Sequence, residues 1–174
     1  MTRQFKSLKE IEEYMKSHEI RNRVFRDEGI RQVLAHEMSE AVHDVVYANY
    51  TPKSYQRRKD AGGLSSQANM YVTHVEIFIG DIVVFFENLT MGQRHDLPIY
   101  DEPIDSLDGQ FITDTIVEGI KNNWYYPEEK DKFDRIPSVP RDFITETIKN
   151  IKANPAPLIK AIKRAYKKVG FDIK

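Results

Sequence analysis

The sequence predicts an α+β fold in which a long helix packs on a small antiparallel β-sheet, with further helices near both ends and long loops between them. Two observations support this prediction. Between residues 30 and 50, apolar residues recur at the i, i+3, i+4, i+7 spacing of an amphipathic helix. Residues 69–79 instead alternate and are rich in β-branched and aromatic side chains, which is typical of a strand. The chain has 174 residues, so we expect one domain with its own core over residues 1–174.

The N-terminal part predicts a helix over about residues 7–18. Ser7 and Glu10 have the spacing of a capping box, in which each side chain satisfies a free backbone N–H of the first turn. After this helix, residues 21–28 are dense in charge, and we expect them to form a turn or to lengthen the next helix. Gly29 is expected to be a break or a weak point, because glycine disfavours a helix interior.

The long helix is predicted to run from Ile30 to about Tyr50. Its end is set by Pro52, because a proline disfavours helical geometry at the residue before it, here Thr51. One face of the helix carries the apolar stripe and the other carries polar and charged residues, which suits solvent or a partner.

A β-hairpin is predicted over residues 69–88. Gly80-Asp81 has the composition of a tight two-residue turn, and residues 82–88 form the returning strand. A two-stranded hairpin is only marginally stable alone, so it needs the long helix or strands from a neighbouring copy. The face expected to pack on the helix carries Tyr71, Val75, Ile77 and Ile79; the polar face carries His74 and Glu76.

The rest of the chain predicts two irregular stretches and three helices. A short helix is expected over residues 111–120, before an irregular stretch over 122–139. The C-terminal helical segment, about residues 140–170, is expected to contain two helices. The first has Pro140 at its first position, and Pro155 and Pro157 open the second, which ends at Gly170. A polar loop over residues 90–109 holds five acidic residues, Asp96, Asp101, Glu102, Asp105 and Asp108.

The end of the long helix and the segment after it carry a resemblance. The residues are Val46-Tyr47-Ala-Asn-Tyr50-Thr-Pro52-Lys-Ser-Tyr55-Gln-Arg57-Arg58, followed by Gly62-Gly63-Leu64. With the long helix before them and the hairpin after them, they resemble a group of small virion proteins of tailed phages, the head–tail joining and tail-completion (neck) proteins.

The resemblance implies a structural component and not an enzyme. Identical copies would close into a homo-oligomeric ring around the DNA channel. Portal, tail-tube or other head–tail connector proteins would be the neighbours in the virion, and assembly would take place in the host cytoplasm. Contacts between copies are expected from the hairpin and from the segment after the long helix, with the candidate interface residues Tyr50, Pro52, Tyr55, Arg57, Arg58, Gly62 and Gly63.

The alternative is a phage protein that binds or processes DNA through the basic segment Lys53–Lys59. Its cations could hold phosphates while Tyr55 stacks on a base. We favour contacts with a neighbouring copy because the net charge of −1 is too balanced for a dedicated DNA-binding domain. A third hypothesis is a small host-encoded enzyme with an unrecognised site.

Cofactor and metal sites are not expected. The chain has no cysteine, which excludes disulfides and thiolate ligands and fits a reducing compartment. His36, Glu40 and His43 could line one helix stripe of metal ligands, but the second histidine of an H-E-x-x-H site would stand at position 40. We therefore interpret them as an exposed polar face, and the acidic loop as lacking the spacing of a calcium loop.

Charge is unevenly distributed along the chain. Residues 61–135 hold fourteen acidic and five basic residues, and residues 136–174 hold three and nine. The acidic middle and the basic end could pair with each other or with neighbouring copies. No apolar run reaches the roughly 20 residues of a membrane span, so no membrane partner is expected.

Overall fold

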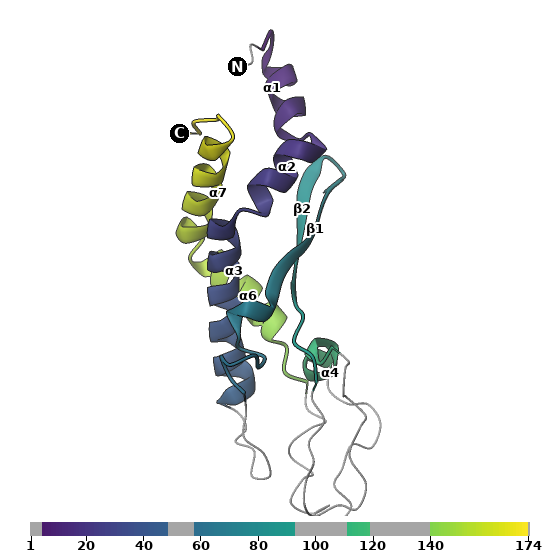
Figure 1. Ribbon diagram of the computed structural model, residues 1–174, viewed down its shortest axis with the longest axis vertical. Coiled ribbons are helices and arrows are strands. Elements are labelled where there is room, and N and C mark those ends of the chain that lie inside the picture. Colours follow the sequence, from purple (N-terminus) through teal and green to yellow (C-terminus); the bar gives the residue numbers. More distant parts are fainter. Residues whose placement is uncertain (1–4, 49–57, 93–110, 119–139, 174) are drawn as a thin grey trace, which may run out of the picture. The chain divides into compact units, whose positions relative to one another are not determined.

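The computed structural model describes residues 5–48, 58–92, 111–118 and 140–173. It confirms the α+β fold: within these residues, helices accompany one two-stranded antiparallel sheet (Figure 1). The elements are α1 (Leu8–Met15), α2 (His18–Phe25), α3 (Glu28–Ala41), the π-helix η1 (Val42–Tyr47), the 3₁₀ helix η2 (Gln67–Asn69), β1 (Met70–Phe78), β2 (Asp81–Asn88), α4 (Thr113–Glu118), α6 (Phe143–Ala153) and α7 (Ala156–Lys168).

The chain divides into two compact units that interleave in sequence. Unit 1 contains Met1–Leu34, Tyr71–Glu87 and Pro155–Lys174; unit 2 contains Ala35–Met70 and Asn88–Asn154. The division therefore falls inside α3 and at the open end of the hairpin, so neither unit is a continuous piece of chain.

The predicted capping box opens α1. Ser7 Oγ accepts a hydrogen bond from Glu10 N at 3.2 Å, as predicted, whereas Glu10 Oε2 accepts from the backbone N of Lys6, one residue before the N-cap, at 2.8 Å. The helix ends at Met15 rather than at residue 18. Ser17 has an extended ψ of 149° and separates α1 from a second helix.

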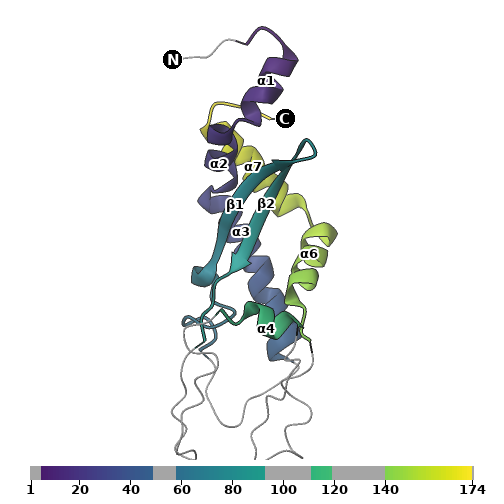
Figure 2. The same ribbon diagram turned by 90° about the vertical axis from the view of Figure 1, so that its right-hand side faces the viewer.

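The structure corrects the prediction for the charged stretch after α1, residues 21–28. It is neither a turn nor part of the long helix, because residues 18–25 form the separate helix α2. Ile20 and Val24 lie four residues apart on one face and are both buried in the core of unit 1, where α2 packs on α7 (Figure 2). This apolar pair is easily missed in the sequence because arginines surround it. The core cluster comprises Ile20, Val24, Ile30, Ala161, Ala165 and Tyr166.

Gly29 is not a break, because it lies in the first turn of α3. Asp27 precedes the helix, and its Oδ1 accepts a hydrogen bond from Gly29 N at 3.0 Å. Arg31 donates two hydrogen bonds to the carboxylate of Glu28, from Nε to Oε2 at 2.7 Å and from Nη2 to Oε1 at 2.6 Å. This bond from Arg31 lowers the pKa of Glu28 to about 2. The helix thus starts two residues before the predicted Ile30.

The hairpin is confirmed, but its turn is one residue earlier than predicted. Ile79 and Gly80 have φ of +50° and +87°, so they are the two central turn residues and Asp81 already belongs to β2. The predicted buried face is also wrong except at Val75. The buried residues of β1 are Met70, Val72 and Val75, whereas Tyr71, Ile77 and Ile79 are exposed.

The reason is that the buried side chains of β1 do not all lie on the same face of the sheet. Side chains of a strand alternate, so Val72 and Val75 point to opposite sides of the sheet. A single helix covering one face cannot produce this pattern. Within unit 1, Arg26 at the end of α2 holds the strand through a hydrogen bond from Nη2 to Thr73 O at 2.9 Å.

In unit 2, α6 packs on η1, the continuation of the long helix. Val42 and Val46 are buried, and so is Phe143 at the start of α6. The prediction that Pro140 opens this helix is wrong: Asp142 caps it, accepting from Thr145 N at 2.8 Å, so the first helical residue is Phe143. The stop before Pro155 is confirmed.

The last predicted helix is confirmed, and the short helix predicted over residues 111–120 is corrected at its start. In α7, Pro157 lies in the first turn and Gly170, with φ of +96°, follows the end, as expected. Phe111 is not helical; it forms an isolated antiparallel bridge with Met91, and α4 begins at Thr113. The acidic residues of the predicted loop and the stretch around Trp124 lie outside the described residues. Among the described residues, no helix has both the length and the apolar character needed to cross a bilayer.

Candidate interface: the corner at Gly62–Leu64

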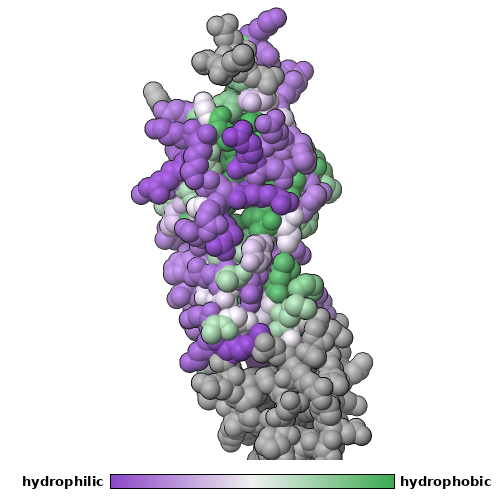
Figure 3. Space-filling view, viewed as in Figure 1, coloured by the Kyte–Doolittle hydropathy of each residue, from purple (hydrophilic) through white to green (hydrophobic). Residues whose placement is uncertain are grey.

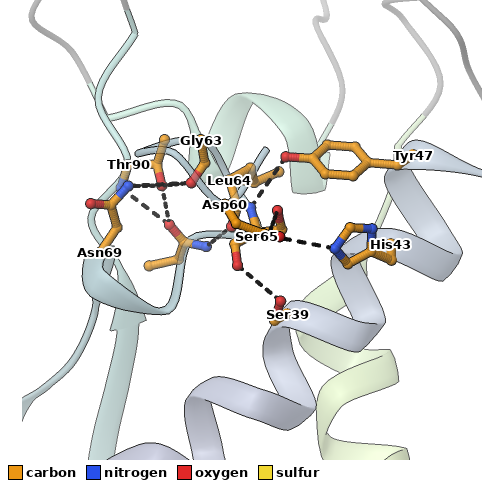
Figure 4. A network of polar contacts seen from close by, with 10 residues as sticks. Ser39, His43, Tyr47, Asp60, Gly63, Leu64, Ser65, Asn69 and Thr90 are labelled. Atoms are coloured by element: carbon orange, nitrogen blue, oxygen red, sulfur yellow. Dashed lines mark hydrogen bonds and ion pairs between the residues drawn. The ribbon is translucent and has the colours of Figure 1, made fainter. Parts of the chain in front are cut away.

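Three of the predicted interface residues lie in the described part of the chain: Arg58, Gly62 and Gly63. The others, Tyr50, Pro52, Tyr55 and Arg57, fall outside it. The three described residues belong to a tight corner, residues 58–66, which lies between the end of the long helix and the base of the hairpin (Figure 4). We call residues 58–66 the corner.

The two glycines of the corner are required for different reasons. Gly62 has φ of +84°, a conformation that L side chains rarely adopt, but there is open space around it. Gly63 has no such φ, yet a Cβ there would lie 2.5 Å from Lys59 O and 2.6 Å from Lys59 N. Its own N–H donates to Lys59 O at 2.7 Å. Gly62 thus supplies a turn, and Gly63 supplies a close approach of two backbone segments.

The long helix holds one side of the corner through three residues spaced four apart. Ser39 Oγ donates to Ser65 O at 2.9 Å, and Tyr47 Oη accepts from Ser65 N at 3.2 Å. His43 Nε2 lies 3.7 Å from Asp60 Oδ1, and its ring meets the Tyr47 ring edge-on at 5.1 Å. Figure 4 shows all three side chains pointing toward the corner.

The π-helix explains how three residues spaced four apart can face one target. In an α-helix, residues four apart drift round the axis by about 40° at each step, because a turn holds 3.6 residues. A π-helix bonds i to i+5 and so has more residues per turn, as in the bond from Ala48 N to His43 O at 2.8 Å. The wider turn of η1 reduces the drift and keeps Tyr47 in line with Ser39.

The base of the hairpin holds the other side of the corner. Asn88 Nδ2 donates to Leu64 O at 2.7 Å, and Asn69 Nδ2 donates to Gly62 O at 3.1 Å. Thr90 is fully buried; its hydroxyl donates to Asn88 Oδ1 at 2.6 Å and accepts from Asn69 Nδ2 at 3.0 Å. The backbone carbonyls of the corner are therefore paired by side chains, as buried polar groups must be.

Arg58, the last arginine of the basic segment, is used within the chain. Its Nη2 donates to Met91 O at 2.6 Å, and Met91 pairs with Phe111. This bond connects the start of the corner to the isolated bridge that follows the hairpin. Arg58 therefore has a structural contact of its own in unit 2.

The corner contains the residue types of a hydrolase triad without its geometry. Ser65 Oγ donates to Asp60 Oδ1 at 2.7 Å, so the hydroxyl is bonded to a carboxylate and not to His43. Ser65 is also buried, with 1% of its surface exposed, whereas a nucleophile must reach its substrate. These three residues position the backbone.

The metal hypothesis finds no support in the described residues, where no three histidine or carboxylate side chains gather closely enough to hold an ion. His43 instead lies beside Asp60 at the corner. Its spacing from His36 and Glu40 in the sequence had suggested a metal ligand. Sequence reasoning missed the supporting residues Ser39, Asn69, Asn88 and Thr90. One signal was available: Asn69 and Asn88 flank the predicted hairpin, and asparagine is a poor strand residue that often bonds to nearby backbone.

Comparison with known proteins identifies the family. A family model described as YomN matches residues 7–168. The chain belongs to the YomN family. This family is phage-derived, of the SPBc2 prophage type, which indicates a phage protein. No curated protein and no solved structure matches the chain.

The YomN match contains every element described above. It begins at Ser7, the N-cap of α1, and ends at Lys168, the last residue of α7. The corner and the core of unit 1 therefore both lie inside the part of the chain that defines the family.

Proposed function

We propose that this YomN-family protein is a structural component of a tailed-phage virion at the head–tail junction. Its copies form a ring around the DNA channel, and neighbouring connector, portal or tail-tube proteins bind the ring. The observation that supports the proposal is the corner, because it fixes both flanks of the segment that resembles neck proteins. Tyr47, near the start of that segment, bonds to Ser65, which follows its last residue Leu64.

A fixed corner suits an interface between copies. Association costs less conformational entropy when the contact segment is already held by a rigid scaffold. Here the helix side chains and the hairpin base each bind the corner backbone, and the donors Asn88 and Ser39 are buried. The residues that flank the segment after η1 are therefore held together at the corner.

Native mass spectrometry of the purified protein, with negative-stain images of the same sample, tests the proposal. Closed rings, alone or after addition of portal or tail-tube protein, are the expected result. Clean monomers under all these conditions would contradict it.

A matched pair of variants sharpens the experiment. Tyr55→Ala with Arg57→Ala should abolish rings while thermal unfolding stays unchanged. The control is Lys152→Ala, which removes an exposed cation on α6, outside the corner and the basic segment. Arg58 is left intact because its guanidinium holds Met91 O.

DNA titration at two salt concentrations separates the alternative hypothesis. If Tyr55→Ala with Arg57→Ala leaves rings intact but weakens a salt-sensitive DNA affinity, the segment binds nucleic acid instead. Intact DNA affinity together with loss of rings would support the interface.

A further inference from the structure

The turn end of the hairpin is an exposed, apolar and acidic surface. Ile79 is 87% exposed and Phe78 is 61% exposed, and Ile77 beside them is also exposed. Monomeric proteins seldom leave neighbouring large apolar side chains in water, so such a cluster marks a contact site. Between Met70 and Asn88 there is no lysine or arginine, whereas Glu76, Asp81 and Glu87 are acidic. We call residues 76–81 the hairpin tip.

A groove beside α7 has the opposite character. Its volume is about 390 Å³, and most of the surface that lines it is apolar. Ile159, which is half exposed, and Ile173 line it together with the basic residues Lys160, Lys163, Arg164 and Lys167. Asp172 is the one acidic residue of the lining. We call this the α7 groove.

The cations of the α7 groove are not used inside the described part of the chain. No ion pair there involves Lys160, Lys163, Arg164 or Lys167, whereas the next residue, Lys168, binds Asp27 at 2.6 Å. On the face shown in Figure 3, hydrophilic side chains dominate the side where α7 lies in Figure 1. Apolar side chains reach the surface on the side of the hairpin.

We propose that the hairpin tip of one copy docks into the α7 groove of the next copy. The two surfaces match in both respects, because apolar side chains would meet an apolar groove and carboxylates would meet its basic rim. Glu76 and Asp81 supply the carboxylates of the tip. A nucleic acid fits less well, since it would leave Ile159 and Ile173 in water.

This inference rests on the proposed function, because it names the contact that builds the ring. The two surfaces differ, so each copy offers one tip and one groove. Such a head-to-tail contact gives a ring when the rotation between copies closes, and a filament when it does not.

Disulfide trapping tests the contact, since the natural chain has no cysteine to give a background. One chain carries Ile79→Cys and a second, longer-tagged chain carries Ile159→Cys. On mild oxidation of the mixture we expect a disulfide-linked heterodimer, and a chain carrying both changes should give a ladder of linked oligomers. The control places the cysteine at Leu8, which is equally exposed on α1 (86%) but lies outside both surfaces.

Charge exchange provides an independent readout by native mass spectrometry. Lys163→Glu with Lys167→Glu should dissociate the ring, and so should Glu76→Lys with Asp81→Lys. A chain carrying all four changes should recover rings, because tip and groove are then complementary again. Thermal unfolding of each variant shows that the exposed changes leave the fold intact.

The outcomes separate this inference from the proposed function. Rings that persist in both charge variants, with no heterodimer trapped, overturn the tip–groove contact but leave a ring-forming virion protein. Natural protein that never forms rings, with or without its neighbours, overturns the proposed function. If the groove variant keeps its rings but loses affinity for DNA, the groove takes an anionic polymer and the inference is wrong.

Discussion

Asp27 and Lys168 join the start of α3 to the last turn of α7 through a contact of 2.6 Å between Oδ2 and Nζ. The other carboxylate oxygen of Asp27 accepts from Gly29 N, so one side chain both caps a helix and binds a cation 141 residues away in sequence. The two tasks can be separated by mutation.

Asp27→Ala should lower the free energy of unfolding by about 2 kcal/mol, of which the cap contributes about 1 kcal/mol. Lys168→Met removes only the ion pair and should cost less than about 1 kcal/mol, because its ammonium is largely exposed. Urea denaturation measures both. Lys160→Met, on the same helix without a described ion pair, is the control. Equal losses for the two variants would show that the cap contributes nothing.

Gly63→Ala should be the most damaging glycine substitution in the corner. A Cβ placed 2.5 Å from Lys59 O forces two backbone segments apart, so we expect a loss of roughly 2 kcal/mol or more. Gly62→Ala, where only the positive φ is strained, should cost about 1 kcal/mol. Urea midpoints compare the two. If Gly62→Ala proves the worse, close approach is not the reason for the second glycine.

Asn88→Ala should destabilise unit 2 by roughly 3 kcal/mol, because it leaves Leu64 O and Thr90 N without their partner in a buried place. Hydrogen exchange of the Thr90 amide should speed up more than exchange in α7, since α7 belongs to unit 1. Glu87→Ala, an exposed change one residue earlier, is the control. Unchanged exchange at Thr90 would exclude the network as the support of the corner.

Glu28 should make stability depend on pH in acid. Its pKa of about 2 in the folded protein lies below the ordinary value near 4.5, because Arg31 bonds to the charged form. The contribution is therefore present above about pH 4.5 and disappears as the pH falls through 2. An NMR titration should find this low pKa, and Arg31→Met should return it toward the ordinary value. A Glu28 that titrates normally in the natural protein would rule the contact out in solution.

The sequence predicted those elements whose signals are local. The Ser7 cap of α1, the hairpin between two strand patterns, and the prolines at the start of α7 each act within a few residues, and each was confirmed. The errors came at elements whose structure depends on contacts with residues that are distant in the sequence. Helix α2 is stabilised by α7, and the core includes only two of its residues, Ile20 and Val24. The faces of β1 change at a point that no alternation pattern marks.

The sequence located the candidate site along the chain, but it did not predict the contacts that hold the site together. Gly62 and Gly63 were correctly placed in a turn, since glycine pairs mark turns. The need for Gly63 is steric and arises from Lys59, which no spacing rule identifies. The donors Asn88 and Thr90 arrive from the far end of the hairpin, and the π-helix that aligns Tyr47 has no recognised sequence pattern. Tertiary contacts, not propensities, complete the corner.

The packing of α2 on α7 has a consequence for synthesis of the protein. Ile20 and Val24 bury their side chains beside Ala161 and Ala165, which the ribosome adds about 140 residues later. At roughly 5–20 residues per second, the first helices wait on the order of ten seconds for their partner. During that time they expose apolar side chains, and unit 1 cannot close its core around an unfinished chain. The surface that contains both the hairpin and α7 is therefore complete only after α7 has been synthesised.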